Sequence, residues 1–388
     1  MNDLNEVLAK GIRSRFVNDI NGLRIHLLEA GFEGKGRPCV LLLHGFPELA
    51  YSWRKVMLPL AEAGYHVVAP DQRGYGLTTG WDPDYDGDLG SYKILNLARD
   101  ASELVSALGY QSIAALVGHD FGSPVAAWCS VTRPDVFRSV VLMSAPFSGT
   151  PTLPLDSVNK HEPLAKPSGT STLSDDLAAL PNPRKHYQEY YKTREAENNM
   201  RNAPQGIHAF LRGYYHFKSA DWRNNRPFTL KARTAGEMAK IPRYYIMDLD
   251  KGMAETVSQE MPTAEEISAC HWLPEDELRI YSEQFQRTGF QGGLQWYRAV
   301  NMYTKEMESF AGQTIDQPSL FIAGANDWGS FQSPGALEYM RNCACTNMQG
   351  VKMVDAAGHW VQQEQPNAVS NLLLEFLQKL NQSKKFLA

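Results

Sequence analysis

The chain has 388 residues, of which 43% are hydrophobic and 21% charged, and its formal net charge is −5. This apolar content can fill a large core, and the negative balance excludes the basic surface of a nucleic-acid-binding protein. No apolar run reaches the roughly 18 residues of a membrane span, and neither end resembles a secretory or peroxisomal signal, so we expect a cytoplasmic protein.

The first predicted element is a β-hairpin near the N-terminus. Residues 16–20 and 23–27 flank the dipeptide Asn21-Gly22. Asn-Gly readily adopts the positive φ angles of a type I′ turn, whose twist matches that of two antiparallel strands. We therefore expect the chain to begin with two paired strands.

Short apolar runs follow the hairpin and lack the alternation of a half-exposed strand. They lie at residues 40–43, 67–69, 114–117, 140–142, 320–322 and 351–354. Runs of this length suit strands that are buried on both faces. Helical patterns occupy residues 92–108, 124–131 and 368–380. The alternation predicts an α/β fold with a mainly parallel sheet covered on both sides by helices.

The alternation stops between residues 147 and 313, where Tyr, Arg, Asn, Pro and Met become frequent. The early part, residues 147–183, is a long connection that we expect to cover a site entrance as a lid. Helical patterns return at 187–199 and 275–288. The simplest organisation is a core domain of residues 1–146 and 314–388 with an inserted helical cap domain of residues 147–313.

The turn between the run at 114–117 and the next helix carries the first candidate catalytic residue. Its sequence, Val-Gly-His-Asp-Phe-Gly-Ser at 117–123, has the context of a nucleophile elbow with Asp120 where serine is common. A carboxylate is already ionised near neutral pH and suits displacement at a saturated carbon with a strained or good leaving group. The product would be an alkyl ester of Asp120. The plainer alternative is an aspartate that caps the following helix.

The loop after the run at 40–43 reads His44-Gly45-Phe46-Pro47. The backbone N–H groups of Phe46 and Phe121 are candidates for an oxyanion hole, which would stabilise the tetrahedral intermediate when water attacks the ester. A cis bond between Phe46 and Pro47 would fix the loop. The alternative is an ordinary turn at the end of a strand.

An acid and a histidine follow the last two predicted strands. Asp327 comes after the run at 320–322, and His359 comes after the run at 351–354. The chain order nucleophile, acid, histidine matches that of α/β-hydrolases. We expect His359 to take a proton from water as general base and Asp327 to orient it. His119 is a lesser candidate, because neighbouring side chains on a sharp turn diverge.

These motifs resemble those of the epoxide hydrolases with the α/β-hydrolase fold, in particular the soluble type with a helical cap. The strings are HGFPE at 44–48, DQRGYG at 71–76, GHD plus an aromatic residue at 118–121, and GHW at 358–360. The resemblance covers about residues 15–380 and implies hydrolysis of a small-molecule epoxide to a vicinal diol. Phe121 is a departure, because the family usually has tryptophan there; its backbone N–H can still serve the oxyanion hole.

The resemblance also implies two cap tyrosines that protonate the epoxide oxygen. By motif these are Tyr187, in RKHYQ, and Tyr297, in GFQGGLQWYR. Neutral tyrosine, with a reference pKa of about 10, suits this role. Tyr190 and Tyr191 lie within one helical turn of Tyr187 and are alternatives for the first donor. The plainer alternative is that all of these rings are packing residues. The expected substrate pocket also includes His44, Pro47, Trp296 and Trp360.

Two other functions compete with this interpretation. A haloalkane or haloacid dehalogenase shares the aspartate nucleophile and the fold, but Phe121 stands where fluoroacetate-type members have arginine. A hydrolase-fold ligand receptor without turnover is compatible with the fold, yet it need not keep Asp120, Asp327 and His359 together. The N-terminal phosphatase domain of some epoxide hydrolases has no room before His44.

The five scattered cysteines favour reduced thiols over a disulfide framework. Cys343 and Cys345 form a single C-x-C pair with no second pair nearby, which disfavours a zinc site. We therefore expect neither a metal nor another cofactor. Both a monomer and a dimer are compatible with the sequence.

Overall fold

The chain begins with the expected hairpin. The structure is a computed structural model that describes residues 7–151, 172–299, 302 and 305–386. Strand β1 (Ile12–Ile20) pairs antiparallel with β2 (Leu23–Ala30). Between them Asn21 and Gly22 have φ angles of 47° and 79°, as a type I′ turn requires.

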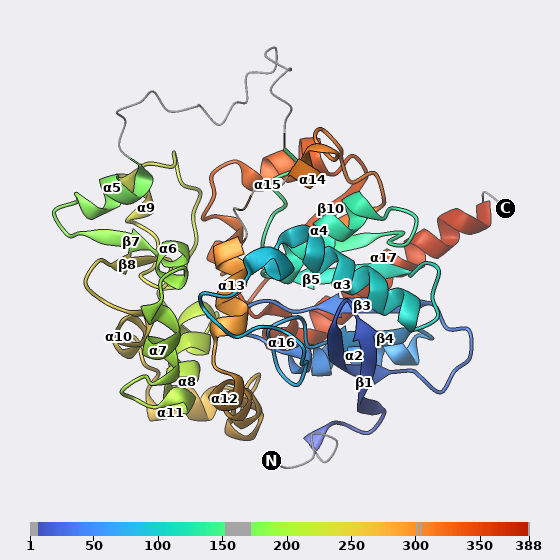
Figure 1. Ribbon diagram of the computed structural model, residues 1–388, viewed down its shortest axis with the longest axis horizontal. Helices are drawn as coiled ribbons and strands as arrows, with labels where there is room; N and C mark the ends of the chain where they lie inside the picture. Colours follow the sequence, from blue (N-terminus) through green and yellow to red (C-terminus); the bar gives the residue numbers. More distant parts are fainter. Residues whose placement is uncertain (1–6, 152–171, 300–301, 303–304, 387–388) are drawn as a thin grey trace.

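In the described chain, an eight-stranded sheet has the order β1-β2-β4-β3-β5-β6-β9-β10 (Figure 1). The hairpin strands are antiparallel to their neighbours, and all pairs from β4 to β10 are parallel. Beyond the hairpin, the strands are β3 (Cys39–Leu43), β4 (His66–Pro70), β5 (Ala115–His119), β6 (Val140–Met143), β9 (Ser319–Gly324) and β10 (Met348–Val354). Every predicted apolar run therefore forms a strand of the sheet.

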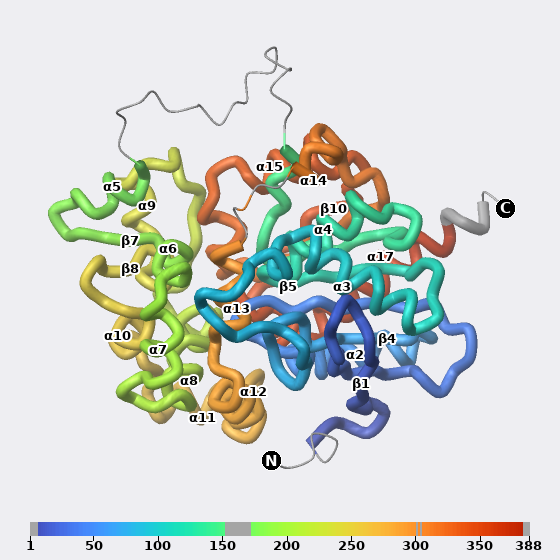
Figure 2. The backbone as a smooth tube through the Cα atoms, viewed as in Figure 1, coloured from blue at the N-terminus to red at the C-terminus, as the bar shows by residue number. Residues whose placement is uncertain are grey.

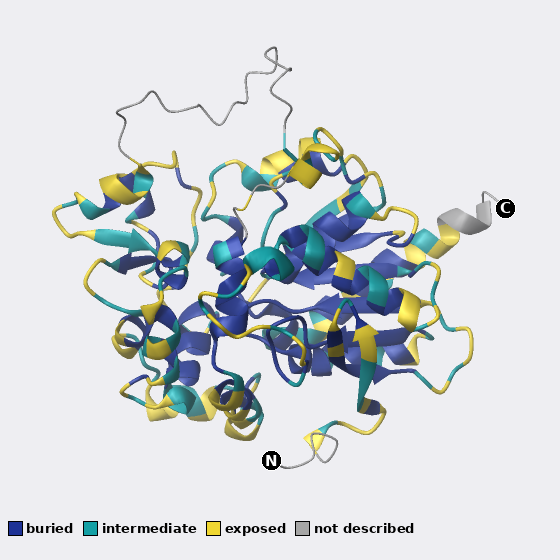
Figure 3. Ribbon diagram, viewed as in Figure 1, coloured by how far each residue is buried: buried dark blue, intermediate teal, exposed yellow. Residues whose placement is uncertain are grey.

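Helices cover the sheet in two groups. Helix α3 (Ile94–Ala107) packs with α4 (Gly122–Thr132), and α2 (Arg54–Glu62) packs with α17 (Pro366–Phe386). Figure 3 shows the central strands of the sheet as almost entirely buried, with exposed residues on the edge strands, the outer helices and the loops. The remaining core elements are short: η1 (Ala50–Trp53), η2 (Leu89–Tyr92), η3 (Trp328–Ser330), α15 (Ala336–Tyr339), η4 (Met340–Ala344) and α16 (Val361–Glu364). No helix of the described residues has the length and apolar content needed to cross a bilayer.

A helical region is inserted between β6 and β9 and lies beside the sheet (Figure 2). It consists of α5 (Leu173–Ala178), β7 (Arg184–His186), α6 (Tyr187–Tyr191), α7 (Glu195–Arg201), α8 (Ile207–Lys218), α9 (Ala235–Met238), β8 (Ile246–Asp248), α10 (Met253–Ser258), α11 (Ala264–Ala269), α12 (Glu275–Thr288), α13 (Gln291–Ala299) and α14 (Lys305–Glu308). Strands β7 and β8 form a small antiparallel pair. Of the segment expected to be a lid, residues 152–171 lie outside the described residues.

The helical pattern expected at 187–199 forms two helices with a break between them. Thr193 donates from both its backbone N–H and its hydroxyl to the Tyr190 carbonyl, at 2.9 and 2.7 Å. These bonds close the last turn of α6, and α7 begins at Glu195. By contrast, the helix expected at 275–288 is confirmed as α12.

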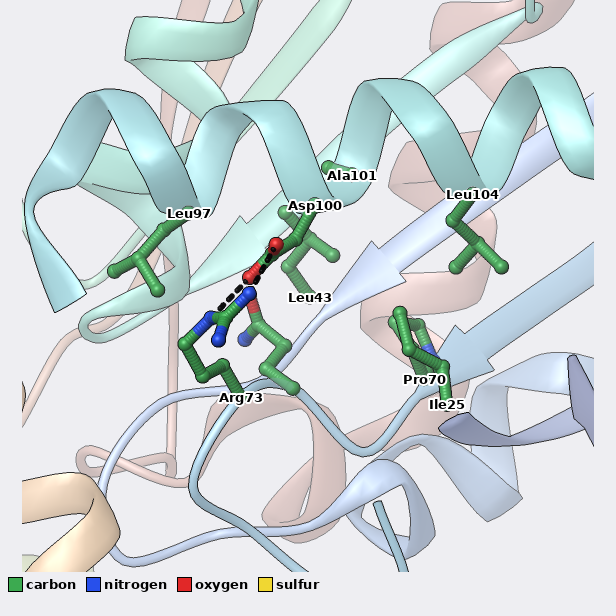
Figure 4. Close-up of a pocket in the computed structure, with 9 residues that line it drawn as sticks. Ile25, Leu43, Pro70, Arg73, Leu97, Asp100, Ala101 and Leu104 are labelled. Atoms are coloured by element: carbon green, nitrogen blue, oxygen red, sulfur yellow. Dashed lines mark hydrogen bonds and ion pairs between the residues drawn. The ribbon is translucent and has the colours of Figure 1, made fainter. Parts of the chain in front are cut away.

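The loop after β4 connects the inserted helices to the core through Arg73. Its guanidinium forms a buried ion pair with Asp100 of α3, with two nitrogen–oxygen distances of 2.8 Å (Figure 4). Its carbonyl accepts a hydrogen bond from Trp296 Nε1 at 2.9 Å. One residue of the DQRGYG motif thus holds helix α3 on one side and helix α13 on the other.

Two glycines allow this loop and α13 to approach closely. A Cβ added at Gly74 would overlap the backbone of Gly292, and a Cβ at Gly292 would overlap the carbonyl of Gly74. Gly74 also has a positive φ of 91°, which favours glycine. The close contact determines how deeply α13, with Trp296 and Tyr297, sits against the core.

We predict that Gly292→Ala destabilises the fold by about 2 kcal/mol or more, because the new methyl group must push α13 away from the loop. Thermal unfolding followed by circular dichroism measures the loss. Gly236→Ala is the matched control, since an added Cβ at that position, also in a helix, meets nothing within 4 Å. Equal melting temperatures for the two variants would contradict the packing argument.

Candidate active site

The candidate catalytic residues follow the carboxyl ends of the parallel strands. Phe46 lies in the loop after β3, Asp120 follows β5, Asp327 follows β9 and His359 follows β10. Because parallel strands end at the same edge of a sheet, residues far apart in the chain meet there. This edge faces the inserted helices.

Asp120 lies on a strained turn that close backbone contacts hold in place. Its φ is 51°, which is uncommon for a residue with a side chain. A Cβ at Gly118 would overlap the Gly122 carbonyl, and a Cβ at Gly122 would overlap the carbonyls of Leu43 and His44. Small residues are therefore needed on both sides of Asp120, because this turn is in close contact with itself and with the end of β3.

The loop after β3 provides one hydrogen-bond donor for the Asp120 carboxylate. The Phe46–Pro47 bond is cis, as predicted, and the Phe46 N–H donates to Asp120 Oδ1 at 2.9 Å. The Tyr215 hydroxyl donates to the Pro47 carbonyl at 2.7 Å. Phe121 begins the turn into α4, and the second donor role of its N–H stays a prediction.

His44 supports this loop from behind. The side chain is fully buried; Nδ1 lies 2.9 Å from the Gly45 carbonyl and Nε2 accepts from the Gln72 N–H at 3.1 Å. Burial lowers the pKa of His44, which favours the neutral ring that this pair of bonds requires. Both ring nitrogens thus bind backbone groups, and a direct role of His44 in a substrate pocket stays a prediction.

His359 joins Asp120 to Asp327. Its Nε2 lies 3.1 Å from Asp120 Oδ2, and its Nδ1 lies 3.0 Å from Asp327 Oδ1. Asp327 Oδ1 also accepts from the Gly329 N–H at 2.8 Å, which holds the carboxylate in place. Both His359 and Asp327 are buried. The sequence-predicted trio is therefore in direct hydrogen-bond contact.

The charges around His359 keep both aspartates ionised. Burial alone would raise the pKa of Asp120, but the hydrogen bond and charge of His359 and the charge of Lys218 hold it well below its usual value. The pKa of Asp327 is also lowered, since His359 outweighs the effect of burial. For His359, burial and Lys218 lower the pKa while Asp327 and Asp120 raise it, and the net pKa is raised.

Tyr187 and Tyr297 lie together in an aromatic wall beside Phe46 and Phe121. Their ring centroids are 6.1 Å apart, and Tyr297 contacts Phe121 at 5.1 Å and Phe46 at 5.5 Å. Burial, followed by the charge of Asp120, raises the pKa of both phenols well above the usual value. Both therefore stay protonated and able to donate at neutral pH.

The remaining expected pocket residues pack around this wall. Trp296 contacts Phe121 edge-on at 5.1 Å, and Trp360 contacts His359 at 4.7 Å. The hydroxyl of Tyr191, the alternative to Tyr187, lies 3.0 Å from that of Tyr214, whereas the Tyr187 hydroxyl accepts from Gln188 Nε2 at 3.2 Å and keeps its own proton available. The Tyr190 hydroxyl donates to Asn199 at 2.8 Å.

Two charged groups near the site were missed by the sequence reasoning. Glu48, the last residue of HGFPE, is fully buried and lies 2.6 Å from His119 Nδ1, while His119 Nε2 donates to the His359 carbonyl at 2.7 Å. The position of Glu48 in the HGFPE motif was the sequence signal that could have identified it. Lys218 ends α8 in buried surroundings and had no motif to mark it. Among the described residues, no group of His, Cys, Asp and Glu has the arrangement of a metal site.

Known proteins share both the sequence and the architecture. The family model described as alpha/beta hydrolase fold matches residues 38–366. Epoxide hydrolase A of Mycobacterium tuberculosis is 33% identical over 373 residues, which cover 92% of this chain and 95% of that protein. Epoxide hydrolase B of the same organism is 31% identical over 368 residues, with 92% and 96% covered.

Solved structures agree with these relatives. An epoxide hydrolase from an endophytic Streptomyces superposes with a TM-score of 0.74 at 30% identity, covering 96% of this chain and 97% of that one. Epoxide hydrolase I of potato, Solanum tuberosum, superposes with a TM-score of 0.70 at 30% identity, covering 95% and 99%. The chain therefore belongs to the epoxide hydrolases of the α/β-hydrolase fold.

Proposed function

We propose that this enzyme opens epoxides by a covalent route in which Asp120 is the nucleophile and the product is a vicinal diol. The observation that carries the proposal is the pair of hydrogen-bond contacts made by the Asp120 carboxylate. Asp120 Oδ1 accepts from the Phe46 N–H and Oδ2 lies 3.1 Å from His359 Nε2, so the group is ionised, oriented and next to a base. The described part of residues 147–313 acts as the cap of the site.

In the first step, an Asp120 oxygen attacks one ring carbon of the epoxide, and the bond between that carbon and the ring oxygen breaks. The alkoxide that forms takes a proton from Tyr187 or Tyr297. Both phenols are protonated and buried, so they donate in surroundings where water does not compete strongly. The result is an alkyl ester of Asp120.

In the second step, His359 Nε2 takes a proton from water, and the water oxygen attacks the ester carbon of Asp120. The oxyanion of the tetrahedral intermediate accepts the Phe46 N–H, with the Phe121 N–H as the second donor. Collapse of the intermediate breaks the bond to the alkyl oxygen, which receives the proton from His359. The diol leaves, and the proton that the water oxygen still carries on the Asp120 carboxyl returns through solvent to the tyrosinate, which restores both the Asp120 carboxylate and the phenol.

We predict that Asp120→Ala reduces diol formation from trans-stilbene oxide and styrene oxide by at least about a thousandfold, because no other group can form the ester. Chromatography of the diol measures the loss. Asp135→Ala is the control, since that carboxylate forms an exposed ion pair with Arg133. Halide release from 1-bromobutane by a wild-type enzyme that makes no diol would favour a dehalogenase instead.

We predict that Tyr297→Phe and Tyr187→Phe each slow ester formation by roughly a hundredfold, and that the double variant forms none, because general acids contribute about that much. Stopped-flow tryptophan fluorescence in single turnovers follows the step, since Trp296 lies beside Tyr297. Tyr190→Phe is the control on the same helix as Tyr187. If Tyr190→Phe were slow and Tyr187→Phe normal, the first donor would be misassigned.

A further inference from the structure

Lys218 is a buried cation at the reaction centre with no part in the mechanism above. Its side chain ends helix α8 and is 3% exposed. The Nζ atom lies over four aromatic rings, 5.5 Å from the centroid of Tyr214, 5.9 Å from Tyr244, 5.3 Å from Tyr245 and 5.2 Å from Trp360. Ring faces of this kind attract a desolvated cation. We call these four rings the lysine cage.

Other buried cations of the described chain have a carboxylate partner, and Lys218 does not. Arg54, Arg73 and Arg212 are equally buried, and they form ion pairs with Glu277, Asp100 and Glu275. Within the described residues, no carboxylate makes an ion pair or hydrogen bond with the Lys218 ammonium. Burying a cation without a direct partner is costly. Because no contacting carboxylate neutralises the Lys218 ammonium, its charge acts on groups further away.

The lysine cage is continuous with the catalytic residues on two sides. Trp360 contacts the His359 ring at 4.7 Å, and Tyr245 contacts the Tyr187 ring at 5.2 Å. The Lys218 carbonyl also accepts the backbone N–H of His359 at 2.9 Å. The end of α8 therefore fixes the ammonium and the catalytic histidine relative to each other.

We propose that Lys218 is a positioning residue for the second half of the reaction: its caged ammonium keeps His359 neutral, and so able to act as a base, while Asp120 is esterified. The inference rests on the proposed function of Asp120 and His359. It concerns the hydrolytic step, in which the base must be free of a proton before water can attack.

The charges that face His359 change during the cycle. In the free enzyme Asp120 and Asp327 are both anionic and favour a protonated imidazole, which explains the raised pKa of His359. Esterification removes the charge of Asp120. Asp327 then remains as the anion in direct contact, opposed by burial and by Lys218. The balance shifts towards the neutral ring at the step that needs it.

The other charged groups nearby do not replace Lys218. His119 packs against His359 at 5.1 Å between ring centroids, but its Nδ1 faces the Glu48 carboxylate at 2.6 Å, so any positive charge there is balanced by a direct partner. Burial lowers the pKa of Lys218, and the longer-range charges of Asp120, Asp327 and Glu48 act against that effect and favour the ammonium. When Asp120 is esterified, fewer anions oppose the field of Lys218.

The test is the pH profile of ester hydrolysis in single turnovers with trans-stilbene oxide. Lys218→Met removes the charge and keeps the length of the side chain. In Lys218→Met we expect the low-pH limb of the hydrolysis-rate profile, the acid limb, to move to higher pH by at least about one unit. The nearby cation opposes protonation of the His359 imidazole, and its removal makes that protonation easier. Hydrolysis near pH 6 then falls about tenfold, while the alkaline plateau and the rate of ester formation change little. Lys218→Arg keeps the charge and should retain the wild-type limb.

Two further variants secure the conclusion. Lys218→Gln gives a second neutral side chain should Lys218→Met fail to fold, and Lys251→Met, near the surface of the same region, should leave the limb unchanged. Ester formation with an unshifted limb in both neutral variants, or an equal loss of rate at every pH, would overturn the role of Lys218. Absence of any ester in the wild type would instead overturn the proposed function.

Discussion

The catalytic geometry depends on how closely the turn after β5 approaches the end of β3. Gly118 and Gly122 leave no room for a Cβ, and the backbone at Asp120 adopts a positive φ. Only this approach places the Asp120 carboxylate within hydrogen-bond distance of both the Phe46 N–H and His359. The strain of the turn is local, and the sheet on either side over-determines it. In the proposed reaction, every later step relies on that carboxylate being held before the substrate arrives.

The inserted helices are placed by an equally direct contact. Gly74 and Gly292 meet backbone to backbone, and Arg73 binds both α3 and α13. The tyrosine on α13 therefore reaches the site through a rigid connection to the sheet and not through side-chain packing alone. The proposed nucleophile and the proposed proton donor come from different regions of the chain, yet both are fixed to the same core.

The sheet and the contact between Asp120, Asp327 and His359 could be predicted because their signals are local. Apolar runs, strand-end turns and the order of Asp120, Asp327 and His359 each depend on a few adjacent residues. The break between α6 and α7 could not, since it depends on which carbonyl Thr193 binds. Lys218 was also invisible, because a lysine at the end of a helix is normally exposed; only the packing of distant rings such as Tyr245 and Trp360 buries it.

The loop that carries His359 shares its backbone hydrogen bonds with the inserted region. Glu364 accepts the N–H groups of Gly358 and of Ala220, and the Lys218 carbonyl accepts the N–H of His359. A boundary drawn by sequence order would separate segments that are hydrogen-bonded to each other. An exchange of this region between related enzymes must therefore carry residues 358–364 along with residues 218–220, or the transplanted helices will arrive without the partners that anchor the histidine.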